Sequence, residues 1–557
     1  MGTTDYDVGT GIVELSGNLP KDDLLVGPDI LPVPKEKRTW GYLAYIGNWS
    51  TVIDAAPFAV GGASVALGVP VIEAIVASLI SIVFLYFLII IQSHAASRYG
   101  LAEPQLERVR FGIYGQYIAS LTRGIIALGW FGIQTYVFTE VVDGLYYVLS
   151  GKTAVLLKIV SAGPLAELHA NPALFIGTFI AVYILESFLM YLSKVSKSQK
   201  AIRHILLANI PIAILAFTGV FVVVMSQIHW NFGIAISAVS AIHSNIPVFL
   251  IIFILLNAVL ADVITISMSM PDLVRFAKSQ KVQIYSQLFV IPFYFAATAF
   301  GILASAASLH IYGTVIYDPV LLTTLSSIPL SIKILLLVGI AYATYAVNVQ
   351  ANLLAPSYDM SNLYPGKFNF WRGSLIAIVI SLALQGWALY YNAVSFLEGW
   401  LGLYGTFLGP IVGVIIADYF VIRRFKFDPN ELYNRKGQYR YLKGFNPAAI
   451  IAVAVPVALL LLPIPGHATM SDLSTYIGFA IAFVIYLLLM KWWVIPKYQP
   501  FLRGGLRYGY SNDSLDSIFS SDKKRKIPSP GSSDSTKLET PKSSENNNLK
   551  EEGNYNA

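Results

Sequence analysis

Long apolar segments follow one another from residue 41 to residue 493, separated by short polar stretches. Each is close to the roughly 20 residues that a helix needs to cross the hydrocarbon core of a bilayer. We therefore expect about twelve membrane-spanning helices, at residues 41–67, 71–93, 113–147, 172–193, 201–226, 245–270, 283–310, 328–355, 373–393, 399–422, 447–463 and 474–493. The pattern predicts an all-α polytopic membrane protein.

Lysine and arginine gather in every second loop between these segments. The basic loops hold Arg98, Arg108 and Arg110; Lys194, Lys197, Lys200 and Arg203; Arg275, Lys278 and Lys281; Lys367 and Arg372; and Arg423, Arg424, Lys426, Arg435, Lys436, Arg440 and Lys443. The alternate loops carry only Lys152 and Lys158. The positive-inside rule then predicts an even number of spans, with both termini cytoplasmic. We expect a multi-pass protein of the plasma membrane.

Composition narrows the class of protein. Hydrophobic residues make up 55% of the 557 residues and charged residues 13%, which excludes a soluble globular protein of this size. The net charge of +6 lies in loops and tail, so we expect no nucleic-acid partner. The chain has no cysteine, and its seven histidines lack metal-ligand spacing, so we expect no metal and no cofactor. No G-x-S-x-G motif, phosphate loop or repeated filter segment points to an enzyme or a channel.

The chain divides by composition and by the predicted spans. Residues 1–38 form a polar cytoplasmic segment without the features of a signal peptide. If the spans form two halves, residues 39–243 are a first repeat of five helices and residues 244–424 a second. Residues 425–496 hold a cytoplasmic loop and two further helices, and residues 497–557 read as a disordered cytoplasmic tail.

Two spans carry an acid where hydrocarbon is expected. Asp54 in the first span is followed by Pro57 and then a glycine pair, which predicts a break in that helix. Asp262 lies in the middle of the sixth span, with Pro271 at its exit. Interrupted helices at matching positions of two halves are typical of inverted-repeat transporters, with the binding site at the break.

Neither of these two spans contains a lysine or arginine partner for its acid. An unpaired carboxyl in hydrocarbon favours its neutral form, so Asp54 and Asp262 could each carry a coupling proton. The alternative is that each is protonated and bonds a neighbouring helix.

Polar side chains in two further spans suit a planar ligand. Trp130 and Gln134 are four residues apart and share a helix face, offering a stacking surface and an amide. Asn348 and Asn352 share a face of the eighth span, which we expect to stop at Pro356. The alternative for both pairs is structural: core packing and hydrogen bonds between helices.

Several motifs together resemble the nucleobase–cation symporter-1 family, from about residue 38 to residue 495. They are RTWG (Arg38 to Gly41), GWFGIQT (Gly129 to Thr135), MPDLVRFAKSQK (Met270 to Lys281), NVQANLLAPSYDMSNLYP (Asn348 to Pro365), GPIVGVIIADYFVIRR (Gly409 to Arg424) and the later FDPNELYNRKGQYRY. The resemblance implies a five-plus-five inverted-repeat (LeuT-like) fold with two extra helices. It implies that Trp130 stacks the substrate, that Gln134 and Asn352 bond it, and that Asn348 lies one turn earlier.

Two departures from the family pattern change which ligand and which coupling ion we expect. The sixth helix has Asp262-Val263 where the family often has a Gly-Trp pair, so a second stacking surface is missing. The eighth helix has Ala343, Ala346 and Val347 at positions where sodium-coupled members carry oxygen ligands. Side chains of alanine and valine cannot ligate a hard cation, which favours protons over sodium.

We therefore expect a secondary active transporter that imports a small nitrogenous heterocycle, such as a nucleobase, hydantoin, allantoin or related vitamin, by alternating access. The expected partners are this substrate, a coupling ion and membrane lipid, and the expected state is a monomer. Sodium coupling, an amino-acid or amine cargo and a receptor built on a transporter fold are the alternatives.

Overall fold

The computed structural model describes residues 4–7, 9–15, 22, 24–27, 29–160, 171–192, 199–239, 247–365, 367–385, 388, 395–463, 467–500 and 502. All of them belong to one compact unit, Met1–Asp513. The predicted disordered tail falls almost entirely outside the described residues, as do Lys194 and Lys197 of the second basic loop.

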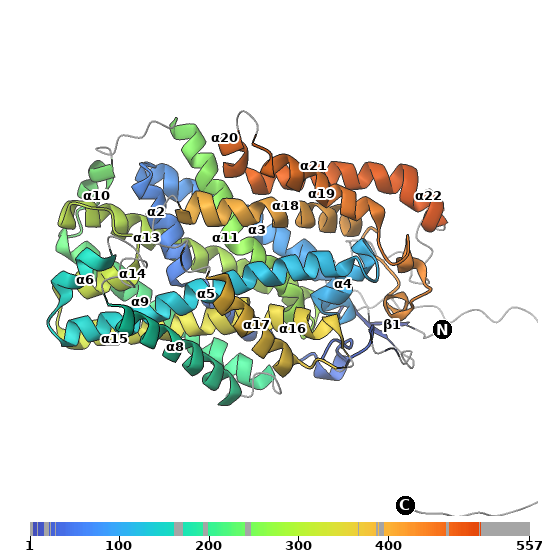
Figure 1. The fold of residues 1–557 in the computed structure, drawn as a ribbon, viewed down its shortest axis with the longest axis horizontal. Coiled ribbons are helices and arrows are strands. Elements are labelled where there is room, and N and C mark those ends of the chain that lie inside the picture. Colours follow the sequence, from blue (N-terminus) through green and yellow to red (C-terminus); the bar gives the residue numbers. More distant parts are fainter. Residues whose placement is uncertain are drawn as a thin grey trace, which may run out of the picture. The chain divides into compact units, whose positions relative to one another are not determined.

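The described chain is built almost entirely from helices (Figure 1). The α-helices are α1 (Tyr42–Ser50), α2 (Ala55–Ala66), α3 (Val71–Tyr99), α4 (Glu103–Phe111), α5 (Gln116–Leu149), α6 (Thr153–Val160), α8 (Pro172–Leu192), α9 (Gln199–Gln227), α10 (Phe232–Val239), α11 (Val248–Val274), α12 (Gln280–Ser286), α13 (Val290–Tyr312), α14 (Pro319–Leu325), α15 (Leu330–Val347), α16 (Leu354–Leu363), α17 (Phe370–Leu384), α18 (Gly402–Ile416), α19 (Pro447–Leu461), α20 (His467–Asp472), α21 (Ser474–Leu489) and α22 (Ile495–Tyr498). Wider π-helical turns are η3 (Asn348–Leu353), η5 (Ser395–Leu401), η6 (Ala417–Ile422) and η9 (Met490–Val494). Short 3₁₀ turns are η1 (Lys35–Lys37), η2 (Gln287–Phe289), η7 (Asn430–Tyr433) and η8 (Gln438–Arg440).

Nine helical stretches among the described residues are long and apolar enough to cross a membrane. Three shorter apolar helices, α2, α17 and α19, lie where the sequence pattern predicts further spans. The class of all-α polytopic membrane protein is confirmed, whereas the count of twelve spans stays a prediction. The sequence pattern missed one feature, an N-terminal antiparallel hairpin of β1 (Thr4–Asp7) and β2 (Ile12–Leu15).

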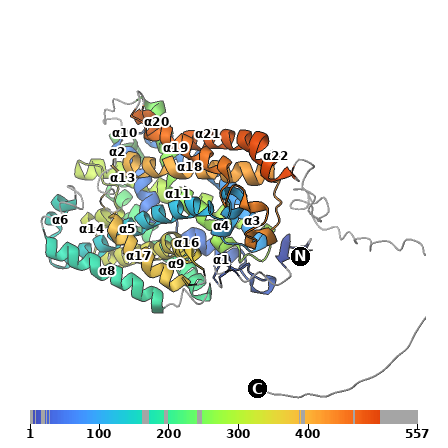
Figure 2. The ribbon, with the colours of Figure 1, turned by 45° about the vertical axis from the view of Figure 1, so that its right-hand side comes forward.

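Helix packing follows a reciprocal pattern between the two halves of the bundle. The second helix of the first half, α3, packs along α11, the first helix of the second half. In the same way α13, the second helix of the second half, packs along α2, which belongs to the first helix of the first half. The third helices, α5 and the α15–η3–α16 stretch, pack on each other. This exchange is what two inverted repeats of a LeuT-like fold produce, and α18, α19 and α21 pack together beside them (Figure 2).

The first span is broken at the predicted place. α1 ends at Ser50, the next four residues are not helical, and α2 begins at Ala55. Asp54 is the N-cap of α2, and its side chain accepts a hydrogen bond from the backbone nitrogen of Ala56 at 3.3 Å. The acid therefore satisfies a backbone donor that the break exposes.

The prediction of a second interrupted helix is wrong, because α11 runs without a break from Val248 to Val274. The segment from 248 to 270 contains neither proline nor glycine, so nothing in its backbone weakens the helix. Asp262 finds its partner through its side chain instead, since the Tyr294 hydroxyl of α13 donates to Asp262 Oδ2 at 2.6 Å. A buried carboxyl satisfied in this way does not require the backbone to open.

The prediction that the eighth span stops at Pro356 is also wrong. After α15 the chain makes the wide turn η3 and continues as α16 to Leu363. Pro356 lies in the first turn of α16, directly after the π turn, and the helix continues through it to Leu363. The π turn thus places Asn348 and Asn352 inside a continuous span.

The basic loops after the second and tenth spans meet at one end of the bundle. Arg108 donates to the carbonyl oxygens of Leu25 at 2.9 Å and Leu432 at 3.2 Å, and Arg423 donates to that of Val109 at 3.3 Å. These contacts agree with the predicted alternation of loops between two ends. Which end faces the cytoplasm stays a prediction.

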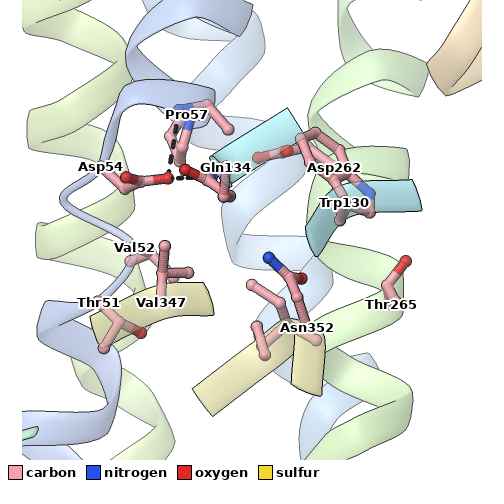
Figure 3. A pocket seen from close by; sticks show the side chains of 13 residues that line it. Thr51, Val52, Asp54, Pro57, Trp130, Gln134, Asp262, Thr265, Val347 and Asn352 are labelled. Carbon is pink, nitrogen blue, oxygen red and sulfur yellow. Dashed lines mark hydrogen bonds between the residues drawn. The ribbon is translucent and has the colours of Figure 1, made fainter. Parts of the chain in front are cut away.

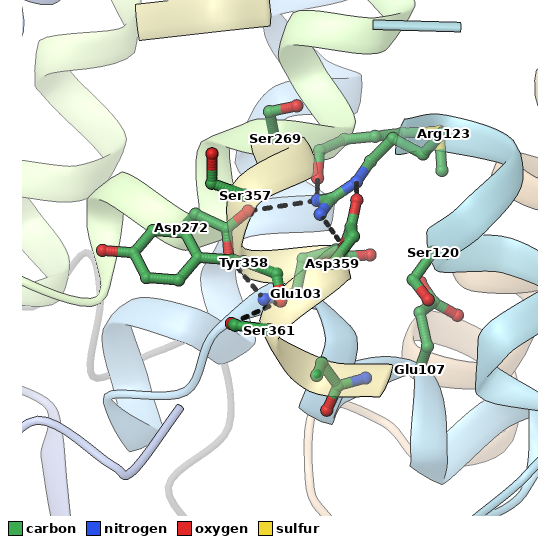
Figure 4. Close-up of polar contacts among 12 residues, drawn as sticks. Glu103, Glu107, Ser120, Arg123, Ser269, Asp272, Ser357, Tyr358, Asp359 and Ser361 are labelled. Carbon is green, nitrogen blue, oxygen red and sulfur yellow. Dashed lines mark hydrogen bonds and ion pairs between the residues drawn. The ribbon is translucent and has the colours of Figure 1, made fainter. Parts of the chain in front are cut away.

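Buried charges join both halves between this end and the middle of the bundle (Figure 4). Arg123 of α5 pairs with Asp359 of α16 at 2.5 Å and with Asp272 of α11 at 3.2 Å. The backbone nitrogen of Glu103 in α4 donates to the other oxygen of Asp272 at 3.0 Å. We call these four residues the Arg123 cluster.

Candidate functional site

A pocket opens in the middle of the bundle, between the broken first helix, α5, α11 and the α15–η3 stretch (Figure 3). Its cavity volume in this conformation is about 20 Å³, which is room for about one water molecule. The lining residues are Thr51, Val52, Asp54, Ala56, Pro57, Trp130, Gln134, Asp262, Thr265, Ile266, Val347, Ala351 and Asn352.

Most of the residues that the sequence nominated meet in this one pocket. Figure 3 shows the side chains of Asp54, Trp130, Gln134, Asp262 and Asn352 arranged around a common space. These five positions are up to 298 residues apart in sequence (from 54 to 352), and four separate helical stretches carry them. The fold therefore brings together a ring, two amides and two carboxyls.

The remaining nominated residues lie behind or beside the pocket. Asn348 is buried and does not line it. Of the three positions discussed for cation coupling, Val347 lines the pocket, whereas Ala343 and Ala346 are fully buried elsewhere in α15.

Asp54 and Gln134 are bonded to each other at the break. Gln134 Nε2 donates to Asp54 Oδ2 at 2.6 Å, which fixes the orientation of the Gln134 amide. Gln134 Oε1 and Asp54 Oδ1 are buried and have no hydrogen-bond partner among the described residues. Gln134 Oε1 is an acceptor, whereas Asp54 Oδ1 accepts when the acid is ionised and donates when it is protonated.

Asp262 is the second carboxyl that lines the pocket, after Asp54. Its Oδ2 accepts from Tyr294, and among the described residues neither Asp262 nor Asp54 has an ion-pair partner. Burying a charged carboxylate without a cation is costly, so both groups are expected to be stable at membrane depth in their neutral form or opposite a ligand cation.

Trp130 gives the pocket a rigid aromatic wall. Its ring is held edge-on by Phe396 and Trp400 at 6.0 Å between centroids and by Tyr404 at 6.2 Å. Gly129 makes this packing possible, because a Cβ there would lie 2.3 Å from the Trp400 ring. Among the described lining residues Trp130 is the single aromatic side chain, so the pocket has one stacking surface.

Behind Asn352 lies a polar network that the sequence reasoning missed. Asn352 Nδ2 donates to Asn348 Oδ1 at 3.1 Å, and Asn348 Nδ2 lies 3.0 Å from Glu186 Oε1. Thr135 of α5 contacts Glu186 Oε2 at 2.8 Å. The sequence did contain a signal that could have pointed to Glu186, because it is the one charged residue in the predicted span 172–193. Tyr294 carried no such signal, because tyrosine is frequent in this chain.

With this geometry in place, comparison with known proteins is informative. Residues 32–494 match the family model described as "Permease for cytosine/purines, uracil, thiamine, allantoin". The chain belongs to this permease family. The match covers most of the chain and confirms the resemblance to the nucleobase–cation symporter-1 family.

Individual members of the permease family resemble the chain over nearly its whole spanning region. An allantoin permease of Bacillus subtilis is 28% identical over 493 residues, which is 86% of this chain and 96% of the relative. A purine-uracil permease of Arabidopsis thaliana is 29% identical, over 80% of this chain and 72% of the relative. A permease family consists of transporters rather than enzymes, as the sequence predicts.

Solved structures show the same fold. Mhp1, a nucleobase-cation-symport-1 family transporter with bromovinylhydantoin bound in a closed conformation, superimposes with a TM-score of 0.66 at 22% identity, over 85% of this chain and 97% of Mhp1. A Na⁺-coupled sialic acid symporter superimposes with a TM-score of 0.52 at 12% identity, over 85% of this chain and 92% of that one. The protein is therefore a multi-pass membrane transporter with the inverted-repeat fold.

Proposed function

We propose that the permease imports a small nitrogenous heterocycle, of the nucleobase, hydantoin or allantoin kind, by alternating access. The observation that carries the proposal is the pocket at the helix break, where one aromatic face and two amides surround a common space. A flat ring with polar edges matches one stacking wall and two hydrogen-bonding side chains. The names of the relatives, which include allantoin, purine-uracil and hydantoin permeases, support the same class of cargo.

Each wall has a separate role in this proposal. Trp130 stacks on the ring of the ligand, because its own ring is held rigid by aromatic neighbours. Gln134 and Asn352 bond the ligand edges, and Asn348 supports Asn352 from behind. Asp54 and Asp262 face the ligand from the break and from α11.

Protons are the proposed coupling ion. The two pocket carboxyls can each take up a proton, and Ala343, Ala346 and Val347 offer no side-chain oxygen for a sodium ion. One observation favours sodium as the alternative: the hydroxyl of Thr344, in the same turn, is buried and has no hydrogen-bond partner among the described residues. An oxygen held in this way could ligate a cation.

The acids also favour a second cargo. A ligand ammonium between Asp54 and Asp262 would neutralise one ionised carboxylate and donate a hydrogen bond to the carbonyl oxygen of the other, protonated acid, which suits an amine or amino-acid substrate. Amines therefore belong in any ligand screen of this protein.

The proposal includes the orientation of the protein in the membrane and its oligomeric state. The basic loops that meet at one end of the bundle face the cytoplasm, and so do both termini. The protein acts as a monomer in the plasma membrane, as expected from the sequence.

The test is uptake into proteoliposomes. Purified protein is reconstituted, the membrane potential is clamped, and radiolabelled allantoin, uracil, hydantoin or a simple amine is supplied under a proton gradient, a sodium gradient or neither. We expect saturable uptake of a heterocycle that depends on the proton gradient. Amine uptake without heterocycle uptake would overturn the cargo, and uptake driven by sodium with no response to protons would overturn the coupling ion.

A matched pair of variants tests the site. Trp130→Ala removes the stacking wall and should weaken binding by about 5- to 150-fold, from about 1–3 kcal/mol of stacking. Trp492 is 68% exposed on the outside of the bundle, so Trp492→Ala should leave binding unchanged. Equal effects of the two substitutions would place the ligand elsewhere.

A further inference from the structure

A short turn before α19, at the end of the bundle where the basic loops meet, carries exposed apolar and basic side chains together. Leu442 and Phe445 are 45% and 39% exposed, although both are large hydrophobic residues. Lys443 is exposed between them, and Arg440 is exposed just before them. We call residues 440–445 the basic turn.

Hydrogen bonds hold the backbone of the basic turn against the bundle. Leu442 and Phe445 pair through two backbone bonds of 3.0 and 3.1 Å. The hydroxyl of Tyr441 donates to a carbonyl oxygen of α4 at 2.7 Å, and the Gly444 carbonyl oxygen accepts from the nitrogen of Tyr114, ahead of α5, at 2.8 Å. The exposed side chains therefore stand on a backbone that is fixed at both sides.

The basic turn is also strained. Tyr441 and Lys443 have positive φ angles of 43° and 53°, in a region that residues other than glycine seldom occupy. Strain of this kind persists only where the surrounding structure enforces it, and it is most common at functional sites. The result of the strain is that Tyr441 is buried while Leu442 and Lys443 face away from the bundle.

The end of the last long helix adds a second exposed group at the same level. α19 and α21 run side by side (Figure 1), and Asn446, which follows the basic turn, donates to the sulfur of Met490 at 3.6 Å. The next three residues, Lys491, Trp492 and Trp493, are all exposed and lie in the π turn η9. Each residue of a wider turn advances through a smaller angle, so three in a row share one outward side.

Both exposed groups are basic. Residues 435–445 contain four lysines or arginines, residues 488–498 contain two, and neither segment contains an aspartate or glutamate. Among the described residues, Arg440, Lys443 and Lys491 have no ion-pair partner. Cations beside exposed apolar side chains fit a partner that has negative charge next to hydrocarbon.

The position of these groups on the spanning helices identifies the partner. The basic turn directly precedes α19, and η9 directly follows α21. Exposed apolar side chains continue from them along the outer sides of both helices, at Ile451, Val455, Val484 and Leu488. In a multi-pass membrane protein such sides contact acyl chains, so the two groups lie at the level of the headgroups, where tryptophan is enriched and lysine reaches toward phosphate.

We infer that the basic turn and Lys491–Trp493 form a docking surface for an anionic phospholipid. Arg440 and the two lysines bind the charged headgroup, and the exposed apolar side chains of both groups contact the acyl chains. The inference does not depend on which cargo the pocket takes. Because the basic turn is bonded to the beginning of α5, bound lipid should also raise the unfolding temperature.

The first test compares two lipids on the wild-type protein. Purified protein in neutral detergent is titrated with dioleoylphosphatidylglycerol or dioleoylphosphatidylcholine, bound lipid is counted by native mass spectrometry, and the unfolding temperature is measured alongside. The acyl chains are identical, so binding of phosphatidylglycerol that is about tenfold tighter or more reports the headgroup charge. Inorganic phosphate at the same concentration should have no effect. Equal binding of the two lipids, or equal stabilisation by phosphate, would overturn the inference.

The second test removes charge or apolar surface separately. The double substitution Lys443→Gln and Lys491→Gln should weaken binding of phosphatidylglycerol about 30-fold and leave phosphatidylcholine unchanged. Lys152→Gln with Lys158→Gln removes two exposed lysines beyond the far end of α5 and should change neither. Leu442→Ser should weaken both lipids by the same factor. Equal effects of the two lysine pairs would show that net charge, and not this surface, selects the lipid.

The same spectra report the competing occupant, a second copy of the chain. A dimer that Lys443→Gln with Lys491→Gln converts to monomer, without a change in lipid binding, would overturn the inference. If this double variant does not fold, the wild-type protein still gives an answer. A tenfold rise in salt concentration should weaken binding of phosphatidylglycerol but not of phosphatidylcholine, because exposed charges are screened. Binding of phosphatidylglycerol that is independent of salt would count against the docking surface.

Discussion

Gln134 and Asp54 are joined by a 2.6 Å hydrogen bond that ties the third helix to the break in the first. The carboxyl of Asp54 serves two partners at once, the Gln134 amide and the backbone nitrogen of Ala56 at the start of α2. A residue proposed to carry a proton thus also holds a ligand-binding side chain in place. We therefore predict that protonation of Asp54 and ligand binding at Gln134 influence each other through this hydrogen bond.

Substitution of Asp54 should separate these two roles. Asp54→Asn keeps an oxygen for Gln134 and Ala56 but cannot exchange a proton, so we expect binding within a few-fold of wild type and loss of the response of uptake to a proton gradient. Asp54→Ala also removes the N-cap of α2, which costs about 0.5–2 kcal/mol, and should lower the unfolding temperature as well. Equilibrium binding and gradient-driven uptake on the same preparations provide the measurement. Full proton-driven uptake by Asp54→Asn would exclude this carboxyl as the coupling site and leave Asp262.

The close approach of α2 and α13 gives a prediction about stability. A Cβ on Gly301 would lie 2.0 Å from the Phe58 carbonyl oxygen, and a Cβ on Gly61 would lie 2.3 Å from that of Thr298. Backbone atoms cannot move aside as a flexible side chain can, so Gly301→Ala should destabilise the protein by about 1–3 kcal/mol through overpacking. The thermal unfolding midpoint in detergent is the measurement.

Gly177 in α8 provides the matched control. A Cβ there has no heavy atom within 4 Å, and alanine is the better helix former, so Gly177→Ala should be neutral or stabilising by up to about 1 kcal/mol. Equal destabilisation by the two substitutions would show that helix packing at Gly301 is not the cause.

The sequence predicted an all-α membrane protein, because a helix that crosses a bilayer needs about 20 apolar residues, whatever its neighbours are. It also nominated Asp54, Trp130, Gln134, Asp262 and Asn352, because polar groups in hydrocarbon are rare and stand out. The sequence did not predict structural features that depend on a contact between residues distant in the chain. The unbroken α11 depends on Tyr294, which lies 32 residues from Asp262 in sequence. The role of Asn348 depends on Glu186, 162 residues away, which no local pattern links to it.

Outside the membrane, the N-terminal segment is attached through an ion pair between Asp22 and Arg435. Arg435 Nη2 donates to Asp22 Oδ1 at 2.6 Å, and this bond lowers the pKa of Asp22 below its ordinary value of 3.8. A carboxyl with a lowered pKa contributes stability that is complete above its unfolded pKa and is lost as the pH falls through its folded pKa. The attachment should therefore be insensitive to pH between 5 and 8 and weaken below about pH 4.

Asp22→Asn tests this attachment. Because the pair is partly exposed, at 44% for Arg435 and 13% for Asp22, its loss should cost at most about 1 kcal/mol. At pH 7 the variant should expose the N-terminal segment to protease faster than wild type, and the difference should shrink as the pH falls through the folded pKa of Asp22. A difference that does not shrink at any acidic pH where the protein stays folded would mean that the charge of Asp22 is not what holds the segment.

The Arg123 cluster yields a prediction about alternating access. Arg123 lies seven residues before Trp130, and Asp359 lies seven residues after Asn352, so the pair closes the bundle about 10 Å from the pocket, by the helical rise of 1.5 Å per residue. The prediction is that opening the pocket toward this end parts α5 from α16 and breaks the pair. Asp359→Asn removes the charge but not the side-chain volume, and should shift the population toward states open at this end.

The absence of cysteine makes this shift measurable. A single substitution, Thr265→Cys, places the protein's one thiol in the pocket, and its labelling rate by a membrane-impermeant maleimide reports access from the chosen side. With reagent on the side of the basic loops, Asp359→Asn should raise the labelling rate about tenfold, as expected if about 1.4 kcal/mol of the preference for the closed state is lost. Arg435→Gln, which breaks an exposed pair at the same end, should leave the rate unchanged. If Asp359→Asn lowered the unfolding temperature but did not alter labelling from either side, the cluster would stabilise the fold without controlling access to the pocket.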